Sequence, residues 1–167
     1  MARTSSPEAR TSSPEFPNNG GLYTRYSITL LAWVFLENTD GPIFNYGVDY
    51  YGVYFWVAEG HLFCQFGRSG SYIRMLHGGS LNRDTWNFVG ASYDFVTGFA
   101  RIWIEGKVYE ELDINRHELN TTGAVRMGAV TGDGRFLKGR IFCLQVYNKA
   151  LTEREVHAAR GLCFERG

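Results

Sequence analysis

The sequence predicts an all-β protein, an antiparallel sandwich or barrel with one short C-terminal helix. About ten short segments rich in β-branched and aromatic residues alternate between two sets of side chains, as strands do. The 20 glycines suit tight connections between them, whereas only 4 prolines are present. The only good helical candidate is the segment 151–160. Many short strands with tight turns are typical of sandwiches and barrels.

The expected strands are bounded by turn-forming sequences such as NTDG, GRSG, HGGS and TGDG. They cover residues 27–36, 42–47, 51–58, 61–67, 71–76, 86–94, 98–106, 107–114, 124–130 and 139–148. Gly98 suits positive φ in the hairpin turn before the seventh strand, and Glu105–Gly106 leads into the eighth. The sixth to eighth strands therefore form a meander. Both faces of the sixth carry bulk, so we expect one face in the core and the other beneath a loop or second sheet.

The helix is expected at residues 151–160 because its N-terminal signals agree. Thr152 can cap the helix, and Glu155 completes the capping box S/T-x-x-E. Leu151 can pack against Val156 across the first turn. One short helix therefore follows the last strand.

Residues 1–21 differ in character from the rest of the chain. The heptapeptide ARTSSPE at 2–8 recurs at 9–15, and the segment is poor in apolar residues. We therefore expect a flexible or cloning-derived leader at 1–21, one folded domain at 22–163 and a tail at 164–167.

Charge and hydropathy exclude two classes of partner. Lys plus Arg and Asp plus Glu number 17 each, so no net field attracts nucleic acid. The most apolar run, residues 28–36, ends at Glu37 and is far shorter than the roughly 18 residues of a membrane helix. Membrane insertion is not expected.

The three cysteines match none of the paired spacings of zinc sites. Two arrangements are open: all three are reduced, or Cys143 and Cys163 form a disulfide that ties the C-terminal tail to a strand. In the second arrangement Cys64 is a small buried apolar residue.

Two motifs carry a resemblance to a known family. Residues 139–156 read G-x-I-x-x-x-x-V-Y-N-K-A-L-T-E-x-E-V, and residues 86–94 read W-x-F-V-x-x-x-Y-D before a glycine-bounded hairpin. With the apolar strand 28–36, they resemble the concanavalin A-like lectin/laminin G superfamily, in its pentraxin-like branch, over about residues 22–160. The resemblance implies a jelly roll of two curved antiparallel sheets. It also implies an extracellular role in adhesion, glycan recognition or matrix assembly, often with calcium.

The calcium ligands implied by the resemblance are incomplete. Many relatives read G-x-I-D in the closing strand, whereas Phe142 stands at the acidic position here. Asp49 and Asp133 are the candidate metal ligands. Weaker candidates are Asn38, Asp40 and Asn45. Calcium takes 6 to 8 oxygen ligands, so turn formation by these residues is the favoured interpretation.

A hydrolase is the least favoured interpretation. Glycan hydrolases that share this jelly roll carry E-x-D-x-E on one strand, whereas residues 111–115 read E-x-D-x-N, with Asn115 in the last position. The partner carboxylate that glycoside hydrolysis requires is therefore missing. We expect Glu111 and Asp113 on a solvated edge strand and no enzymatic activity.

Candidate ligand-binding residues lie in loops. Tyr50 and Tyr51 stand between two glycines at a turn, where flat rings with hydroxyls reach a sugar or protein. Arg74 and Arg135 belong to a set of basic residues that form a patch for sulfated glycans if the strands bring them together. The set also includes Arg68, Arg83, Arg101, Arg126, Lys138 and Arg140. By contrast, we expect Tyr54, Trp56 and Trp103 to fill the sandwich.

The sequence thus predicts a non-catalytic extracellular recognition module that binds a glycan or an extracellular-matrix partner. The alternative is a structural or assembly module of a matrix or biomineral protein, with calcium as its cofactor.

Overall fold

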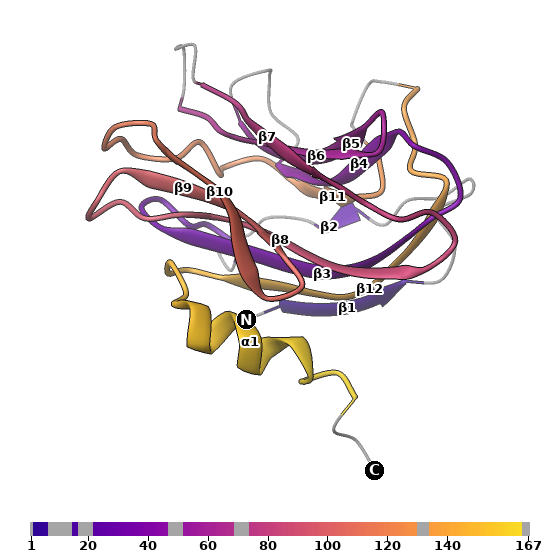
Figure 1. Ribbon diagram of the computed structural model, residues 1–167. Coiled ribbons are helices and arrows are strands. Elements are labelled where there is room, and N and C mark those ends of the chain that lie inside the picture. Colours follow the sequence, from indigo (N-terminus) through magenta and orange to yellow (C-terminus); the bar gives the residue numbers. More distant parts are fainter. Residues whose placement is uncertain are drawn as a thin grey trace.

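The structure, a computed structural model, describes residues 2–6, 15–16, 22–46, 52–68, 74–129 and 134–164. Two antiparallel sheets lie face to face, and one helix lies beneath the lower sheet (Figure 1). The fold is an antiparallel jelly-roll β-sandwich with one short C-terminal helix, as the sequence predicts. No helix in the described ranges is long and apolar enough to cross a membrane.

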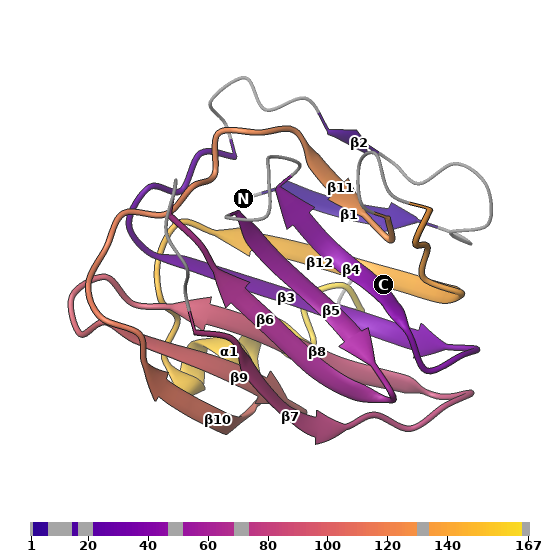
Figure 2. The ribbon, with the colours of Figure 1, turned by 90° about the horizontal axis from the view of Figure 1, so that it is seen from above.

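Each sheet has six strands. Sheet A runs in the order β1 (Ala2–Ser6), β12 (Gly139–Tyr147), β3 (Ile28–Leu36), β8 (Trp86–Tyr93), β9 (Phe99–Ile104) and β10 (Lys107–Asp113). Sheet B runs in the order β2 (Glu15–Phe16), β11 (Val125–Met127), β4 (Gly41–Tyr46), β5 (Val53–Ala58), β6 (His61–Phe66) and β7 (Leu76–Ser80). Figure 2 looks down on sheet B, with β4 to β7 in front of sheet A.

The main core lies between the two sheets, and strand alternation explains which side chains enter it. In β5, Val53, Phe55 and Val57 are buried, whereas the residues between them are half-buried. β6 follows the same pattern, with Leu62, Cys64 and Phe66 in the core. Successive side chains of a strand point to opposite faces, so the other set must face outward.

The hairpin and helix signals are confirmed. Gly98 has a φ of 80° in the turn between β8 and β9, and Asp94 organises that turn by accepting a hydrogen bond from Val96 N at 2.9 Å. The helix α1 (Glu153–Arg160) begins after Thr152, and Thr152 and Glu155 form the capping box. The local signals therefore mark where both elements turn or begin.

One expected strand differs in its position from the strand in the structure. Of the expected strand 71–76, residues 71–73 lie outside the described residues, 74–75 are not in a strand, and β7 covers Leu76–Ser80, mostly in the sequence taken for a turn. β7 contains Gly78 and Gly79, and a side chain at either position would meet the ring of Tyr109 or the side chain of Ile104. The glycines are therefore needed for close packing, which explains why a strand passes through a turn-like sequence.

Two short strands lie within the range 1–21 that the sequence analysis left out of the fold. β1 pairs with β12, and β2 pairs with β11. These two strands differ from the expectation that the segment 1–21 has no folded structure. The strands β12 and β11 would otherwise end their sheets, and an edge strand offers unpaired backbone groups to any extended segment. The division into leader, domain and tail stays a prediction.

A second apolar cluster lies between the outer face of sheet A and α1. Its fully buried members come from both the sheet and the C-terminal segment: Leu31, Phe88, Trp103, Leu151, Val156 and Ala159. Trp103 is 1% exposed, so its burial is as expected, but the expectation that it fills the sandwich is wrong. It faces α1 and donates from Nε1 to Ser92 Oγ at 2.8 Å.

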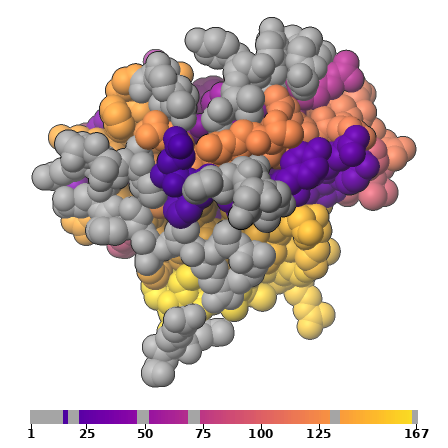
Figure 3. Space-filling view, turned by 180° about the vertical axis from the view of Figure 1, so that it is seen from behind, coloured from indigo at the N-terminus to yellow at the C-terminus, as the bar shows by residue number. Residues whose placement is uncertain are grey.

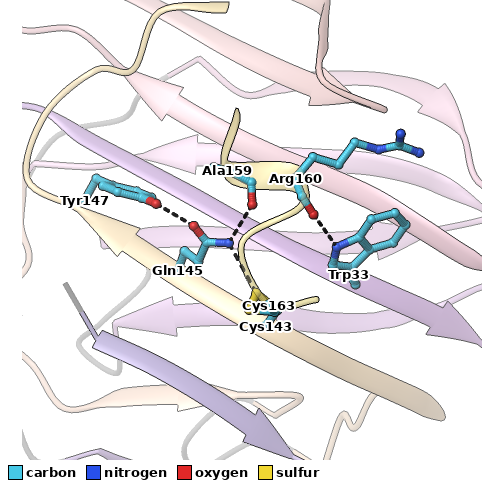
Figure 4. Close-up of a disulfide and its surroundings, with 7 residues drawn as sticks. All are labelled: Trp33, Cys143, Gln145, Tyr147, Ala159, Arg160 and Cys163. Carbon is cyan, nitrogen blue, oxygen red and sulfur yellow. Dashed lines mark hydrogen bonds between the residues drawn. A yellow bond between two sulfur atoms is a disulfide. The ribbon is translucent and has the colours of Figure 1, made fainter. Parts of the chain in front are cut away.

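A disulfide and a buried glutamine attach the C-terminal segment to β12 (Figure 4). Cys143 is bonded to Cys163, and Cys64 is free and buried, which resolves the two arrangements left open by the sequence. A bulge in β12 inserts one extra residue opposite β3, and Cys143 adopts a φ of 55° within it. The bulge lets the consecutive residues Phe142 and Cys143 both lie on the α1 side of sheet A, where Phe142 packs against Phe164 and Cys143 is bonded to Cys163. Leu144 then enters the main core.

Gln145 is fully buried and connects the strand to the end of the helix. Its Nε2 donates to Ala159 O at 3.1 Å, and its Oε1 accepts from the hydroxyl of Tyr147. Nearby, Trp33 Nε1 donates to Arg160 O at 3.2 Å. These bonds satisfy carbonyl groups in the last turn of α1, which has no further turn of helix to do so.

We expect the double substitution Cys143→Ala and Cys163→Ala to lower the free energy of unfolding by about 3 kcal/mol, because the disulfide closes a loop with a sequence separation of 20. Denaturant unfolding with and without reductant measures the effect. Reductant should destabilise the unsubstituted protein and leave the double variant unchanged. Equal free energies of unfolding of the unsubstituted protein and the double variant, both measured without reductant, would contradict the prediction.

Candidate functional site

The outer face of sheet B carries an aromatic row that crosses three strands. Trp56 of β5 pairs with Phe63 of β6, and Phe63 pairs with His77 of β7. Trp56 and Phe63 stack with ring centroids 5.4 Å apart, and Phe63 and His77 stack at 5.6 Å. Pro42 of β4 pairs with Trp56 and extends the row on the other side. We call these four residues the aromatic row.

A polar row runs beside the aromatic row, two residues away in β5 and β6 and three residues away in β4, where a register shift intervenes. It consists of Arg126, Asn45, Tyr54 and Gln65, which are paired in that order across β11, β4, β5 and β6. Directly paired residues of antiparallel strands lie on one face, so this row also faces outward. The face thus offers flat apolar rings next to hydrogen-bonding groups.

A pocket of about 260 Å³ lies where the two rows meet. Side chains of both rows and of the flanking segments line it, among them Asp40, Pro42, Tyr54, Trp56, Gln65 and Arg135. Figure 2 shows the open side of sheet B, on which β4, β5 and β6 lie side by side. An indole, a phenol, an amide, a carboxylate and a guanidinium therefore surround one small concave site.

Asp40 stays ionised at the edge of this pocket. The backbone N–H of Glu59 donates to Asp40 Oδ1 at 2.9 Å, and Thr39 Oγ1 donates to Oδ2 at 2.9 Å. Both bonds favour the charged carboxylate and lower the pKa of Asp40, the bond from Glu59 having the larger effect. The pocket therefore has a fixed anionic acceptor, and Arg135 also lines it.

Asn45 is the most buried member of the polar row. Its side chain has no exposed surface, and its Nδ2 donates to the carbonyl oxygen of Ala129. Its Oδ1 has no hydrogen-bond partner among the described residues. A buried acceptor without a partner costs free energy. Asn45 occupies this position because strand pairing places it between Arg126 and Tyr54 in the polar row.

The structure places the predicted site residues unequally. Arg135 is exposed and lines the pocket. Arg74 is exposed just before β7 and is not a lining residue of the pocket. The remaining candidates, Asp49, Tyr50, Tyr51 and Asp133, lie outside the described residues, so their roles stay predictions.

The expectation that Tyr54 and Trp56 fill the sandwich is wrong. Both are half-buried on the outer face of β5, because the apolar set Val53, Phe55 and Val57 occupies the core. The alternation within VYFWVA separates the two sets, and its pairing with HLFCQF would bring Trp56 opposite Phe63. That signal was legible in the sequence but required the register of two strands.

The basic residues lie on different elements, and several have their own partners. Arg101 forms an ion pair with Glu111, and Arg126 forms one with Glu15 at 3.2 Å. The Arg140 guanidinium lies over the Phe35 ring on the outside of sheet A, 5.0 Å from its centroid. These residues therefore do not belong to one patch.

The metal and hydrolase candidates can be placed in part. Among the described residues, no group of three or more His, Cys, Asp or Glu side chains could hold a metal ion. Asp40 uses both oxygens for protein hydrogen bonds, as a turn residue does. Glu111 and Asp113 lie on β10, the edge of sheet A, and are exposed, as expected of a solvated edge strand.

Comparison with protein families gives a match that covers most of the chain. The family model Laminin_G_3, described as the Concanavalin A-like lectin/glucanases superfamily, matches residues 9–157. No curated protein sequence matches the chain.

Several solved structures share the fold. A botulinum neurotoxin serotype D binding domain superimposes with a TM-score of 0.71 at 15% identity, over 93% of this chain and 42% of that chain. A putative carbohydrate binding protein from Bacteroides ovatus gives 0.69 at 16% identity, over 93% and 45%. A heptameric SAP-like pentraxin from Limulus polyphemus gives 0.66 at 19%, over 90% and 78%. This chain spans less than half the length of the neurotoxin domain and of the Bacteroides ovatus protein.

We expect the carboxyl group of Asp40 to titrate below 3.8, its ordinary pKa. Because the folded pKa is the lower one, its contribution to stability is present above pH 3.8 and is lost as the pH falls through the folded pKa. Carboxyl chemical shifts in an NMR titration measure the midpoint. Thr39→Val removes one donor and should move the midpoint toward 3.8, whereas an unchanged midpoint in this variant would exclude a role for Thr39.

Proposed function

The chain belongs to the Concanavalin A-like lectin/glucanases superfamily, and from this premise we propose that it is a non-catalytic carbohydrate-binding module. The single observation that carries the proposal is the pocket on the outer face of sheet B, lined by Trp56. The carbohydrate-binding name of the Bacteroides ovatus protein supports the proposal at the level of the fold.

The pocket has the chemistry that a sugar ring requires. A pyranose has an apolar face of C–H groups, which packs on an aromatic ring, and a rim of hydroxyls. Trp56 supplies the ring. Gln65 and Tyr54 carry groups that both donate and accept hydrogen bonds, and the Asp40 carboxylate accepts from two hydroxyls of one sugar.

The proposal involves binding and no bond cleavage. Glycoside hydrolysis uses a pair of carboxylates on either side of the scissile bond. Asp40 is the one carboxylate among the described lining residues, and the acidic pair Glu111 and Asp113 lies on the far edge of sheet A. The pocket therefore favours recognition over catalysis.

An extracellular location fits the same proposal. The Cys143–Cys163 disulfide persists in oxidising surroundings and is rare in the cytosol. The ligand in that setting is a glycan on a cell surface, in a matrix or free. The finer identity of the partner is decided by experiment.

We expect Trp56→Ala to weaken glycan binding at least about tenfold, which corresponds to about 1.4 kcal/mol. The substitution removes the apolar platform and leaves the core residues of β5 in place. A glycan array identifies a ligand, and titration calorimetry measures the affinity of each variant. Trp86→Ala is the matched control, because Trp86 is 40% exposed on the outside of sheet A.

Two outcomes would contradict the proposal: no saturable binding of any glycan, or equal affinity of Trp56→Ala and the unsubstituted protein. In the first case the structural or assembly module is favoured. Its contacts would then be sought on the outside of sheet A, where Trp86 and Phe164 are exposed.

Calcium binding is a separate hypothesis that rests on Asp49 and Asp133. If it is correct, calcium at millimolar concentration raises the Tm relative to chelator, because a ligand of the folded state stabilises it by mass action. Asp49→Ala and Asp133→Ala should each remove the rise. An identical Tm in calcium and in chelator would exclude the metal from recognition.

A further inference from the structure

Residues 120–122 read Asn-Thr-Thr, an Asn-x-Thr triplet without proline at its centre. This is the acceptor sequence for N-linked glycosylation, and it occurs once in the 167 residues. Such triplets occur by chance, so the structural setting decides whether one can be modified. An accessible loop in a disulfide-bonded protein is the required context.

Asn120 lies in the loop between β10 and β11, at the rim of the sandwich. Its side chain is half-buried and that of Thr122 is exposed. The backbone is well anchored, since Asn120 N donates to Gly67 O at 2.8 Å and Leu119 N donates to Arg25 O at 2.7 Å. Figure 3 shows orange and purple parts of the chain side by side on this face of the molecule.

The three residues of the triplet have different surroundings. The central Thr121 is fully buried, and its Oγ1 accepts a hydrogen bond from Thr24 N at 3.2 Å. Thr122 Oγ1 instead donates to Asn120 Oδ1 at 3.2 Å. Thr121 therefore anchors the loop, while the side chains of Asn120 and Thr122 contact each other at the surface.

This contact leaves the amide nitrogen as the reactive end of the Asn120 side chain. The Thr122 hydroxyl occupies the carbonyl oxygen, and Nδ2 has no hydrogen bond to a described residue. Asn120 and Thr122 also line an open depression of about 440 Å³, together with Arg68 and Glu118. The depression gives room for an attached sugar.

We propose that Asn120 is a site of N-linked glycosylation. A bond forms between Asn120 Nδ2 and the anomeric carbon of the first sugar of a polyprenyl pyrophosphate-linked oligosaccharide. The bond from that carbon to the pyrophosphate oxygen breaks, the pyrophosphate leaves, and one amide proton passes to a base. The proposal is independent of the glycan-binding pocket and shares with it only the secreted location.

The glycan would stand at the end of β5 and β6. Asn120 N is bonded to Gly67 O, and Gly67 N donates to Gly52 O at 3.0 Å. Gly52 lies two positions before the pocket residue Tyr54, and Gly67 lies two positions after the pocket residue Gln65. Two positions span about 7 Å along a strand. A glycan at Asn120 would therefore cover this rim of the sandwich.

The test is secretion of the chain from animal cells behind a signal peptide, followed by digestion with a peptide N-glycosidase. Release of the glycan should increase electrophoretic mobility and convert Asn120 to aspartate, which mass spectrometry of the peptide detects. Asn120→Gln and Thr122→Ala should both abolish the shift. Thr122→Ser keeps the hydroxyl and should retain it, and Asn148→Gln, at an exposed asparagine outside any triplet, should leave it unchanged.

A secreted, disulfide-bonded protein with unmodified Asn120 would overturn the proposal. Equal Tm values of Asn120→Gln and the unsubstituted protein made in bacteria show that the substitution does not disturb folding. Glycan binding is measured on the unsubstituted protein and on Asn120→Gln, both secreted from animal cells. Failure of binding with a glycosylated Asn120 contradicts the pocket alone, and binding with an unmodified Asn120 contradicts the modification alone.

Discussion

The apolar core between the two sheets determines which side chains the protein presents outward. Burial of Val53, Phe55 and Val57 removes apolar surface from water at roughly 25 cal/mol per Å², so the register of β5 is strongly fixed. A slip by one residue would bury Tyr54 and Trp56 and expose the apolar set. The pocket is thus a consequence of core packing, because the residues that line it cannot be chosen independently of those that form the core.

The two sheets differ in what covers their outer faces. α1 covers the outside of sheet A through Val156 and Ala159, together with Leu151 just before it, and the Cys143–Cys163 disulfide holds the segment after it. On sheet B, the described strands carry instead the half-buried rings of Trp56 and Phe63. The helix, with its cap and its glutamine anchor, therefore covers part of the outer face of sheet A, whereas the outer face of sheet B carries the pocket.

Much of the fold was predictable from local sequence, whereas the site was not. Alternation in VYFWVA and HLFCQF predicts two strands, and Thr152 with Glu155 predicts the start of α1. Alternation divides the side chains of a strand into two sets, but it does not say which set is inside when each contains an aromatic residue. In β5, one set contains Phe55 and the other contains Trp56. That choice depends on the partner strand, since Phe63 continues the outward row and Cys64 the inward one. β7 was missed because its glycines do not make a turn: Gly78 packs against Tyr109, and Gly79 packs against Ile104 with a φ of 79°.

Family membership accounts for the inward residues better than for the outward ones. Structures that share this fold at 13–19% identity must keep apolar alternation and glycine turns, because those define the sandwich. The outward row is not under that constraint, so Trp56, Tyr54 and Gln65 can differ among relatives without loss of the fold. Binding by this chain therefore has to be argued from its own side chains: an indole, an amide and an ionised Asp40 that meet in one pocket.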